Sequence, residues 1–137
     1  ASKDCTFVDR GVLKSHLLSL YGSKKTGRPR ALNNADGIVV DPGDSPYADM
    51  VKGIKRGILM TRFSGGRPSS NGDFAGVAKN SYLIEDGEIR YPISEAMVSG
   101  NFAEMLRSIK AVSSERVDFG YGILPWVAVS GVTISGK

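Results

Sequence analysis

The sequence predicts an α+β fold in which about three short helices accompany a mostly antiparallel sheet, arranged as a sandwich or barrel. Three observations predict it. Segments rich in β-favouring residues outnumber segments with helical periodicity, turn residues join several of them into hairpins, and 41% hydrophobic with 23% charged residues is an ordinary globular composition. Because 137 residues is close to the common size of one domain, we expect residues 1–137 to form a single domain.

The N-terminal part of the chain predicts a hairpin followed by a short helix. Residues 6–8 and 12–13 favour strands, and Asp9-Arg10-Gly11 between them supplies turn chemistry. Apolar residues three and four apart over residues 17–21 then predict a helix that ends around residues 22–27.

A polar loop, a strand and a second helix follow. Residues 28–36 are polar and turn-rich, and the β-branched run at residues 38–40 predicts a strand. Ser45 in front of Pro46 has the order of an N-cap and a first-turn proline, and an apolar stripe over residues 47–54 completes the helix pattern.

The middle of the chain predicts a buried strand, a long loop and a hairpin. Residues 57–63 read as the strand, and the glycine-rich residues 64–72 read as the loop. Residues 74–84 and 89–93 flank an Asp-Gly dipeptide at Asp86, which is typical of a type I′ hairpin turn. Alternation along the second strand directs three side chains toward the core: Ile89, Tyr91 and Ile93.

The C-terminal part predicts one more helix and further strand. Asn101 is placed to cap a helix whose apolar stripe comprises Phe102, Met105, Leu106 and Ile109, and we expect that stripe to be buried. Residues 123–134 contain alternating valines interrupted by Ser130-Gly131, which predicts an irregular strand pair or one bulged strand.

The inventory of reactive side chains excludes several function classes. A single cysteine, Cys5, and a single histidine, His16, leave no internal disulfide and no site of several Cys and His ligands for zinc. A nucleophilic hydrolase would need His16 to activate a serine or Cys5, but a surface histidine and a buried thiol are the commoner arrangement. No apolar run approaches the roughly 18 residues of a membrane helix, so we expect no membrane and a cytoplasmic location.

A cluster of basic residues raises the possibility of nucleic-acid binding. The chain carries a formal charge of +4, and four of its basic side chains lie close together in sequence: Lys24, Lys25, Arg28 and Arg30. Clustered positive charge is the footprint of phosphate binding, yet no aromatic residue accompanies this cluster for base stacking. A solvated loop is therefore favoured over a phosphate-binding patch, and we expect no nucleic-acid partner.

The glycine-rich loop leads into the long predicted strand through residues suited to peptide binding. Small side chains there allow a peptide backbone to approach, and an exposed strand edge accepts an extended peptide through main-chain hydrogen bonds. The candidate groove residues are Asn71, Gly72, Asp73, Phe74 and Gly76. An ordinary loop entering an ordinary strand explains the same composition equally well.

One long run and several short ones resemble a known family. The run GDFAGVAKNSYLIEDGEI at residues 72–89, followed by Tyr91-Pro92-Ile93 and Val98-Ser99-Gly100-Asn101, closely resembles the C-terminal domain of the TldD/PmbA family. Shorter matches lie on both sides of it: Gly11-Val12-Leu13-Lys14-Ser15 with Leu20-Tyr21, and Leu124-Pro125 with Val129-Ser130-Gly131.

The resemblance implies a cytoplasmic peptidase system, once described as a modulator of DNA gyrase, in which two related subunits form a dimer that cuts extended peptides. One subunit type holds zinc through a His-Glu-x-x-x-His helix motif and a late cysteine. This chain has neither, and residues 117–125 contain no cysteine. The resemblance therefore implies the C-terminal portion of a TldE/PmbA-type subunit.

We expect this chain to act as scaffold, dimer surface and one wall of a peptide groove, without a complete catalytic or zinc site. Its expected partners are a second copy or a TldD-type subunit, which would hold the zinc, and an extended peptide substrate. The alternative is a stand-alone basic module that binds nucleic acid through the Lys24 to Arg30 cluster.

Overall fold

The computed structural model describes residues 3–31 and 37–136. Within them strands outnumber helices, the sheets are mostly antiparallel, and no sheet closes into a barrel, which confirms the predicted α+β class. The chain divides into two compact units: unit 1 comprises Ala1–Val39 with Asp118–Ile123, and unit 2 comprises Val40–Val117 with Leu124–Lys137. That residues 1–137 form a single domain stays a prediction.

Unit 1 begins with the predicted hairpin. Strands β1 (Val8–Asp9) and β2 (Val12–Leu13) pair antiparallel, so that Val8 lies opposite Leu13. Arg10 and Gly11 between them have φ angles of 46° and 78°, as a type I′ turn requires.

The first helix, α1, spans Leu20–Thr26 and is thus shorter than the apolar pattern predicts. Ser19 caps its N-terminus and prevents residues 17 and 18 from joining it, while Gly27 ends it in the left-handed conformation. Strand β3 (Ile38–Val39) confirms the predicted strand and pairs in parallel with residues 122 and 123. Residues 32–36 of the predicted polar loop lie outside the described residues.

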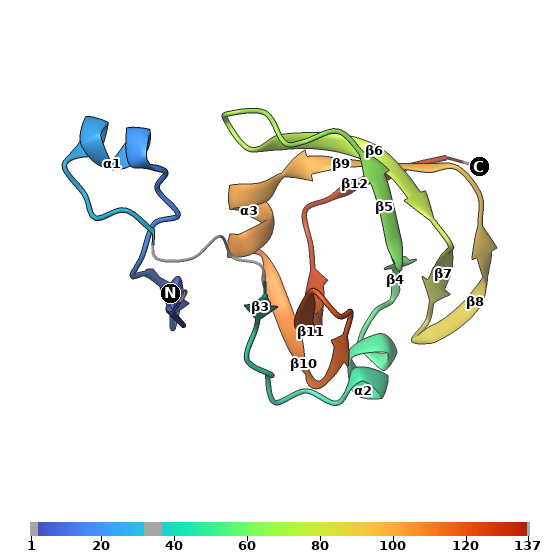
Figure 1. The fold of residues 1–137 in the computed structure, drawn as a ribbon. Coiled ribbons are helices and arrows are strands. Elements are labelled where there is room, and N and C mark those ends of the chain that lie inside the picture. Colours follow the sequence, from blue (N-terminus) through green and yellow to red (C-terminus); the bar gives the residue numbers. More distant parts are fainter. Residues whose placement is uncertain (1–2, 32–36, 137) are drawn as a thin grey trace. The chain divides into compact units, whose positions relative to one another are not determined.

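Three sheets contain the remaining strands (Figure 1). In the described residues their orders are β12-β9-β6-β5, β4-β7-β8 and β10-β11-β3. The strand bounds are β4 Arg56–Leu59, β5 Arg62–Gly65, β6 Asp73–Lys79, β7 Ser81–Glu85, β8 Glu88–Ile93, β9 Ala96–Asn101, β10 Ile109–Asp118, β11 Gly122–Val129 and β12 Thr133–Ser135.

Two predicted single strands are each divided between two sheets. Residues 57–63 form the end of β4 and the start of β5, and residues 74–84 form most of β6 and β7. Asn80, with a φ angle of 49°, separates β6 from β7, because one left-handed residue redirects the chain. The predictions of one continuous strand in each segment were therefore wrong.

The β7–β8 hairpin confirms the predicted Asp-Gly turn, with φ angles of 50° at Asp86 and 77° at Gly87. The predicted inward face of β8 is wrong for two of its three residues, since Ile89 is 43% and Tyr91 60% exposed. Strand β8 lies at the edge of its sheet, and of the three side chains only that of Ile93 packs on the core.

The core of unit 2 is built on the paired strands β6 and β9. Ala78 on β6 packs with Ala96 and Val98 on β9, and these three side chains are buried. Half-buried side chains pack against them, Phe74 from β6 itself and the others from three further segments: Ile58, Ile93 and Val132. Strand β9 was not predicted as a strand, although it pairs with both β6 and β12.

Helix α2 spans Tyr47–Lys52, and its cap differs from the predicted one. Ser45 does not cap it; instead Ser45 forms a parallel bridge to Ser113 on β10. The carboxylate of Glu115, also on β10, accepts a hydrogen bond from the Tyr47 N–H at 2.9 Å. A side chain 68 residues further along the chain thus accepts a hydrogen bond from a backbone N–H in the first turn of α2, which has no partner within the helix.

Helix α3 spans Phe102–Arg107 and confirms Asn101 as its N-cap. The helix ends two residues before Ile109, which begins the unpredicted strand β10. Its expected buried stripe is wrong, since Phe102 is 41% and Leu106 64% exposed. Residues 123–134 do form two strands, but β12 pairs with β9 and not with β11.

Candidate functional site

The predicted groove residues lie together at one end of β6. Asn71 and Gly72 belong to the loop between β5 and β6, and Asp73 begins β6 (Figure 1). Phe74 and Gly76 follow along the same strand. The β6 backbone pairs with β9 from Asp73 onward, which places this loop beside Asn101 at the end of β9.

Asp73 is the centre of a hydrogen-bond network. Its Oδ1 accepts from Asn101 Nδ2 at 2.9 Å, and its Oδ2 accepts from Asn71 Nδ2 at 2.7 Å. Asn101 Nδ2 also donates to the Asn71 carbonyl at 3.0 Å, while Ser69 donates to Asn71 Oδ1. These bonds, first that from Asn101 and then that from Asn71, hold the pKa of Asp73 below its ordinary value. The ionised carboxylate therefore fixes the loop in place.

Phe74 connects this network to an aromatic cluster. Its ring centroid lies 5.9 Å from that of Phe63 in an edge-on arrangement and 5.1 Å from that of Phe102. Gly76 makes room for this cluster, because a Cβ atom there would lie 2.4 Å from Phe63 Cζ. Gly76, whose lack of a side chain was predicted to let a peptide backbone approach, thus makes room for the ring of Phe63.

The three phenylalanines line an open cavity of about 1070 Å³ in unit 2. Residues of α2, β4, β11 and α3 complete its lining, which is mostly apolar. Contributors from these elements include Met50, Ile58, Met105, Trp126 and Val129. Sequence analysis missed this cavity and, apart from Phe74, all of its lining residues; the alternation of apolar residues along 126–132 was the available signal.

Strand pairing decides which sheet edge beside this cavity is free. Strand β6 pairs with β9 on one side and, over residues 76–79, with β5 on the other. Strand β5 is therefore one edge strand of this sheet, with β12 at the other edge, and its four residues, Arg62–Gly65, are all exposed.

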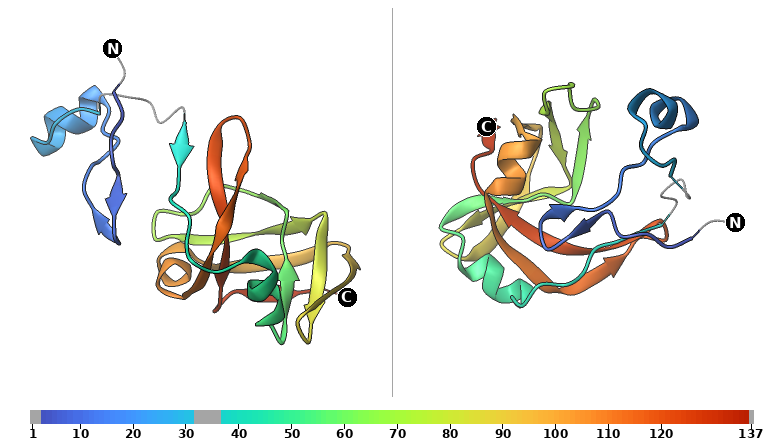
Figure 2. Two further views of the ribbon diagram at one scale, coloured as in Figure 1. Left: turned by 90° about the horizontal axis from the view of Figure 1, so that it is seen from below. Right: turned by 90° about the vertical axis from the view of Figure 1, so that its left-hand side faces the viewer.

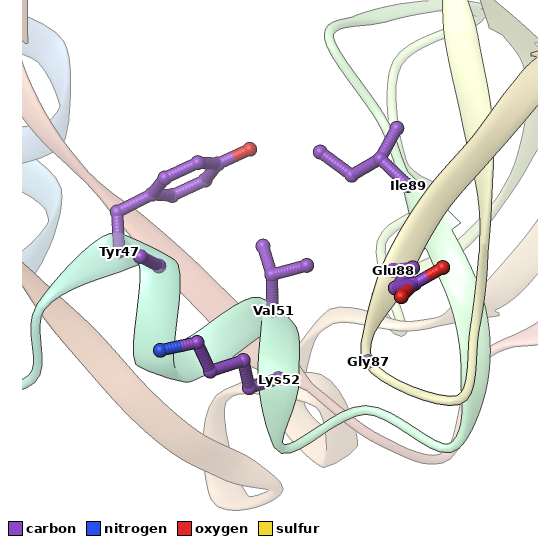
Figure 3. Close-up of a pocket in the computed structure, with 7 residues that line it drawn as sticks. Tyr47, Val51, Lys52, Gly87, Glu88 and Ile89 are labelled. Carbon is purple, nitrogen blue, oxygen red and sulfur yellow. The ribbon is translucent and has the colours of Figure 1, made fainter.

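A second cavity, of about 460 Å³, lies between α2 and the turn of the β7–β8 hairpin. Figure 2 shows this helix next to the hairpin, and Figure 3 shows Tyr47 and Ile89 facing each other across Val51. The turn is attached to the segment after α2, since the Gly87 N–H donates to the Ile54 carbonyl at 2.9 Å. Partial burial raises the pKa of Tyr47, whose ring also packs on Trp126 at 5.3 Å.

The predicted basic cluster lies in unit 1, at the end of α1 and just after it. Lys24 and Lys25 occupy the last turn, and Lys25 Nζ lies 5.7 Å from the centre of the Tyr21 ring. Arg28 Nη1 lies 2.9 Å from His16 Nε2, and Arg30 is exposed. Tyr21 is thus an aromatic neighbour of the cluster that sequence analysis did not recognise.

Two further predictions concern reactive side chains. Cys5 is exposed, which corrects the expectation of a buried thiol. Across residues 3–31 and 37–136 the structure contains no group of three or more His, Cys, Asp or Glu side chains placed to hold a metal ion.

The described helices include none that is long and apolar enough to cross a membrane.

Residues 1–136 match the family model described as PmbA/TldA metallopeptidase C-terminal domain. The chain belongs to the TldD/PmbA family. The resemblance predicted from residues 72–89 and 98–101 is thereby confirmed, and the structure supplies the TldD/PmbA fold on which those residues lie.

Curated relatives of the TldD/PmbA family are named as metalloproteases. Metalloprotease PmbA of Escherichia coli O157:H7 is 30% identical over 134 residues, which cover 90% of this chain and 29% of the relative. A zinc metalloprotease TldD homolog of Saccharolobus solfataricus is 29% identical over 130 residues, covering 86% and 29%. The chain thus spans about three tenths of the length of these TldD/PmbA relatives.

Solved structures of the TldD/PmbA family share the fold over the whole chain. A Bacteroides thetaiotaomicron protein, whose name proposes a role as a modulator of DNA gyrase, aligns with a TM-score of 0.84 at 30% identity. The alignment covers 100% of this chain and 31% of that one. TldE from Thermococcus kodakarensis aligns with a TM-score of 0.81 over 98% of this chain and 34% of its own; at 24% identity it shows the fold alone.

Proposed function

We propose that this chain serves a TldE/PmbA-like subunit of a cytoplasmic metallopeptidase as scaffold, subunit-contact surface and one wall of a groove for an extended peptide. The observation that carries this proposal is the open apolar cavity of about 1070 Å³, lined by Phe63, Phe74 and Phe102. The proposal includes dimerisation with a second copy or with a TldD-type subunit.

The cavity and the free edge of β5 together suit an extended peptide. Alternate side chains of an extended peptide point the same way, so apolar ones reach into a cavity while the backbone pairs with a strand edge. The Asp73 network supports this role because it keeps the loop before β6 in one conformation. A preformed wall loses less conformational entropy when the peptide binds.

The zinc that the family implies does not fit the side chains of this chain. Its one histidine lies 2.9 Å from a guanidinium nitrogen of Arg28, whose positive charge opposes a cation at that nitrogen. Its one thiol, that of Cys5, is exposed, and neither side chain belongs to a described ligand cluster. We assign the zinc to the TldD-type partner.

The absence of a cysteine from residues 117–125 supports the TldE/PmbA type over the TldD type. The curated relatives include both TldD and PmbA names, so the assignment of the type rests on this sequence feature. On this proposal the chain acts by shape and contact, and bond cleavage takes place on the partner.

The proposal is tested with the whole subunit that contains this chain, a TldD-type subunit and an unfolded peptide. We expect zinc-dependent cleavage only from the pair. Phe102→Ala should raise KM by about threefold to tenfold, because an aromatic contact contributes about 0.5–1.5 kcal/mol. Phe119→Ala is the matched control, since Phe119 is also about half exposed but does not line the cavity.

Two results would contradict the proposal. Chelator-sensitive cleavage by the purified subunit alone would show that this subunit, and not the TldD-type partner, carries the catalytic site. Equal KM values for Phe102→Ala and Phe119→Ala would remove the cavity from peptide binding, provided that both variants have the unfolding midpoint of the wild type.

A further inference from the structure

The loop before β6 contains the chain's one Asn-Gly dipeptide, Asn71-Gly72. The fold needs glycine at the second position, because Gly72 has a φ angle of 93° and a Cβ atom there would lie 3.3 Å from Asn101 Nδ2. A glycine after an asparagine also leaves the backbone nitrogen between them unhindered by a side chain, so that this nitrogen can attack the carboxamide. The turn therefore contains an asparagine of the most reactive kind.

The reaction of such a dipeptide is deamidation through a cyclic imide. Gly72 N bonds to Asn71 Cγ, the Cγ–Nδ2 bond breaks, and Nδ2 leaves as ammonia together with the amide proton of Gly72. Water then adds to either carbonyl of the imide, and the ring opens to aspartate or isoaspartate. Because the two reacting groups are neighbours in the chain, the step needs no reactant other than water.

Hydrogen bonds engage both groups that must change in this reaction. The Gly72 N–H, whose proton has to leave, donates to the Ser69 carbonyl at 2.9 Å. The leaving nitrogen, Asn71 Nδ2, donates to Asp73 Oδ2 at 2.7 Å. Asn71 Oδ1 accepts from the Asp73 N–H at 3.2 Å and from the Ser69 hydroxyl, which fixes the orientation of the carboxamide. A carbonyl is too weak a base to remove an amide proton, and its position keeps a base from solvent away.

Asn101 and its neighbour fix the backbone around the same dipeptide. Asn101 Nδ2 donates to the Asn71 carbonyl at 3.0 Å, and the Phe102 N–H donates to the Gly72 carbonyl at 2.9 Å. Attack by Gly72 N therefore requires the loop to open. The rate of deamidation is then the rate in a free peptide multiplied by the fraction of molecules in which the loop is open.

We propose that Asn71-Gly72 is a modification site at which the hydrogen bonds from Asp73 and Asn101 slow deamidation and opening of the loop permits it. The product has a carboxylate at position 71, so an oxygen replaces the nitrogen that donates to Asp73. Two carboxylates at this separation repel each other, and the modified loop stays open. The inference does not depend on the proposed function, because every group involved belongs to this chain.

The test incubates the whole subunit that contains this chain at mildly alkaline pH and follows the tryptic peptide of residues 63–79 by mass spectrometry. Asn71 is the single asparagine of this peptide, which stays intact because trypsin does not cleave between Arg67 and Pro68. The wild type should deamidate at least about tenfold more slowly than a synthetic peptide of the same sequence. Asn101→Ala should deamidate about tenfold faster than the wild type, since it lacks two hydrogen bonds to the loop.

Ala103→Gly is the matched control for this variant. It weakens helix α3, as loss of the N-cap does, but it leaves the bonds from Asn101 to the loop in place. Its deamidation rate should stay within about twofold of the wild type. The consequence of modification is measured by hydrogen exchange of residues 69–73, which should be faster in Asn71→Asp than in Asn71→Ala. Both variants lose the bond to Asp73, and only the first adds a charge.

Three results would overturn the inference. Equal rates for the wild type and the synthetic peptide would show that the network does not slow the reaction. An acceleration in Ala103→Gly as large as that in Asn101→Ala would assign the effect to helix α3. Exchange no faster in Asn71→Asp than in Asn71→Ala would show that a carboxylate at position 71 does not open the loop.

Discussion

Asn101 shows how one side chain joins two parts of the site. Its Oδ1 accepts from the N–H groups of Ala103 and Glu104, which lie in the first turn of helix α3. Its Nδ2 donates to Asp73 Oδ1 and to the Asn71 carbonyl in the loop before β6. One amide therefore connects a helix end to the predicted groove loop.

Two substitutions at Asn101 distinguish its role as the N-cap of α3 from its hydrogen bonds to the loop before β6. Asn101→Ala removes both and should lower the free energy of unfolding by about 1–2 kcal/mol, the usual cost of losing an N-cap together with its other bonds. Asn101→Asp retains the capping oxygen but places a carboxylate against Asp73. Urea unfolding of both variants measures the difference; an alanine variant as stable as the wild type would contradict the assigned roles.

Because of Asp73, the free energy of unfolding should decrease as the pH falls. Hydrogen bonds from Asn101 and Asn71 lower its pKa in the folded chain below the ordinary 3.8. Such a group stabilises the fold fully above the unfolded-state pKa, and this contribution is lost as the pH falls through the folded-state pKa. Asp73→Asn removes the titration. The stability of the wild type relative to this variant should therefore decrease between pH 6 and pH 3 in urea unfolding.

Glu115, whose pKa is lowered first by the Tyr47 N–H, acts in the same direction. It is present in the wild type and in Asp73→Asn, so its effect cancels when the two proteins are compared. A difference in unfolding free energy that stays constant from pH 3 to pH 6 would show that Asp73 does not couple its charge to the fold.

Local sequence predicts caps well when donor and acceptor are close in the chain. Asn101 lies directly before the N–H groups that it caps, and the sequence predicts it correctly. The cap of α2 comes from Glu115 on a distant strand, so Ser45 was the better local candidate and was wrong. The bonds from Asn101 to Asn71 and Asp73 likewise depend on strand pairing, which periodicity does not reveal.

At the scale of elements, hairpins with characteristic turns were predictable and changes of sheet were not. Asp86 and Gly87 have the positive φ angles that an Asp-Gly dipeptide predicts, and Arg10 and Gly11, within the predicted turn at residues 9–11, also have positive φ angles. Polar residues interrupt both segments, Thr61 and Arg62 in residues 57–63 and Lys79, Asn80 and Ser81 in residues 74–84, but a short polar interruption does not by itself show that the chain leaves one sheet and enters another. The division between β6 and β7 falls at Asn80, whose φ angle of 49° lies in the left-handed region that asparagine adopts more readily than most residues.

Gly76 determines how closely β5 and β6 approach each other. A Cβ atom at Gly76 would lie 2.4 Å from Phe63 Cζ and 2.7 Å from both Gly65 Cα and the Ser64 carbonyl oxygen. Because two of these atoms are backbone, rotation of a side chain does not relieve the overlap. Gly76→Ala should lower the free energy of unfolding by about 1–3 kcal/mol.

The matched control for this glycine lies one residue beyond β5. A Cβ atom at Gly66 would have no neighbouring atom within 4 Å, so Gly66→Ala should change stability by less than about 0.5 kcal/mol. Denaturant unfolding of the two variants side by side checks the prediction. Equal stabilities would show that the β5–β6 pair tolerates a methyl group at this contact.

At the scale of the whole molecule, the family and the fold class were predictable, whereas the cavity was not. The match of residues 72–89 to the family depends on the order of residues along the chain, which the sequence gives directly. The cavity combines Phe63, Phe102 and Trp126 from segments that meet only after the sheets have formed. Burial was likewise overestimated in the helices and in β8, because periodicity identifies a shared face without identifying what covers it.

The two units differ in how much apolar surface they bury. Unit 2 buries Val51, Ala78, Ile84, Ala96 and Val98, whereas Gly122 is the one buried residue among the described residues of unit 1. Local opening is easiest where few apolar contacts must break. Amide hydrogens of β1, β2 and α1 should therefore exchange much faster than those of β6 and β9.

Hydrogen exchange of the free, unpaired subunit, followed by mass spectrometry, measures this difference. Peptides that cover residues 73–79 and 96–101 should be protected at least about 100-fold more than those that cover residues 8–26, which corresponds to about 2.7 kcal/mol in opening free energy. The β4–β7 pair provides an internal reference, since Ile84 is buried there. Equal protection of the two regions would contradict this link between apolar burial and local opening.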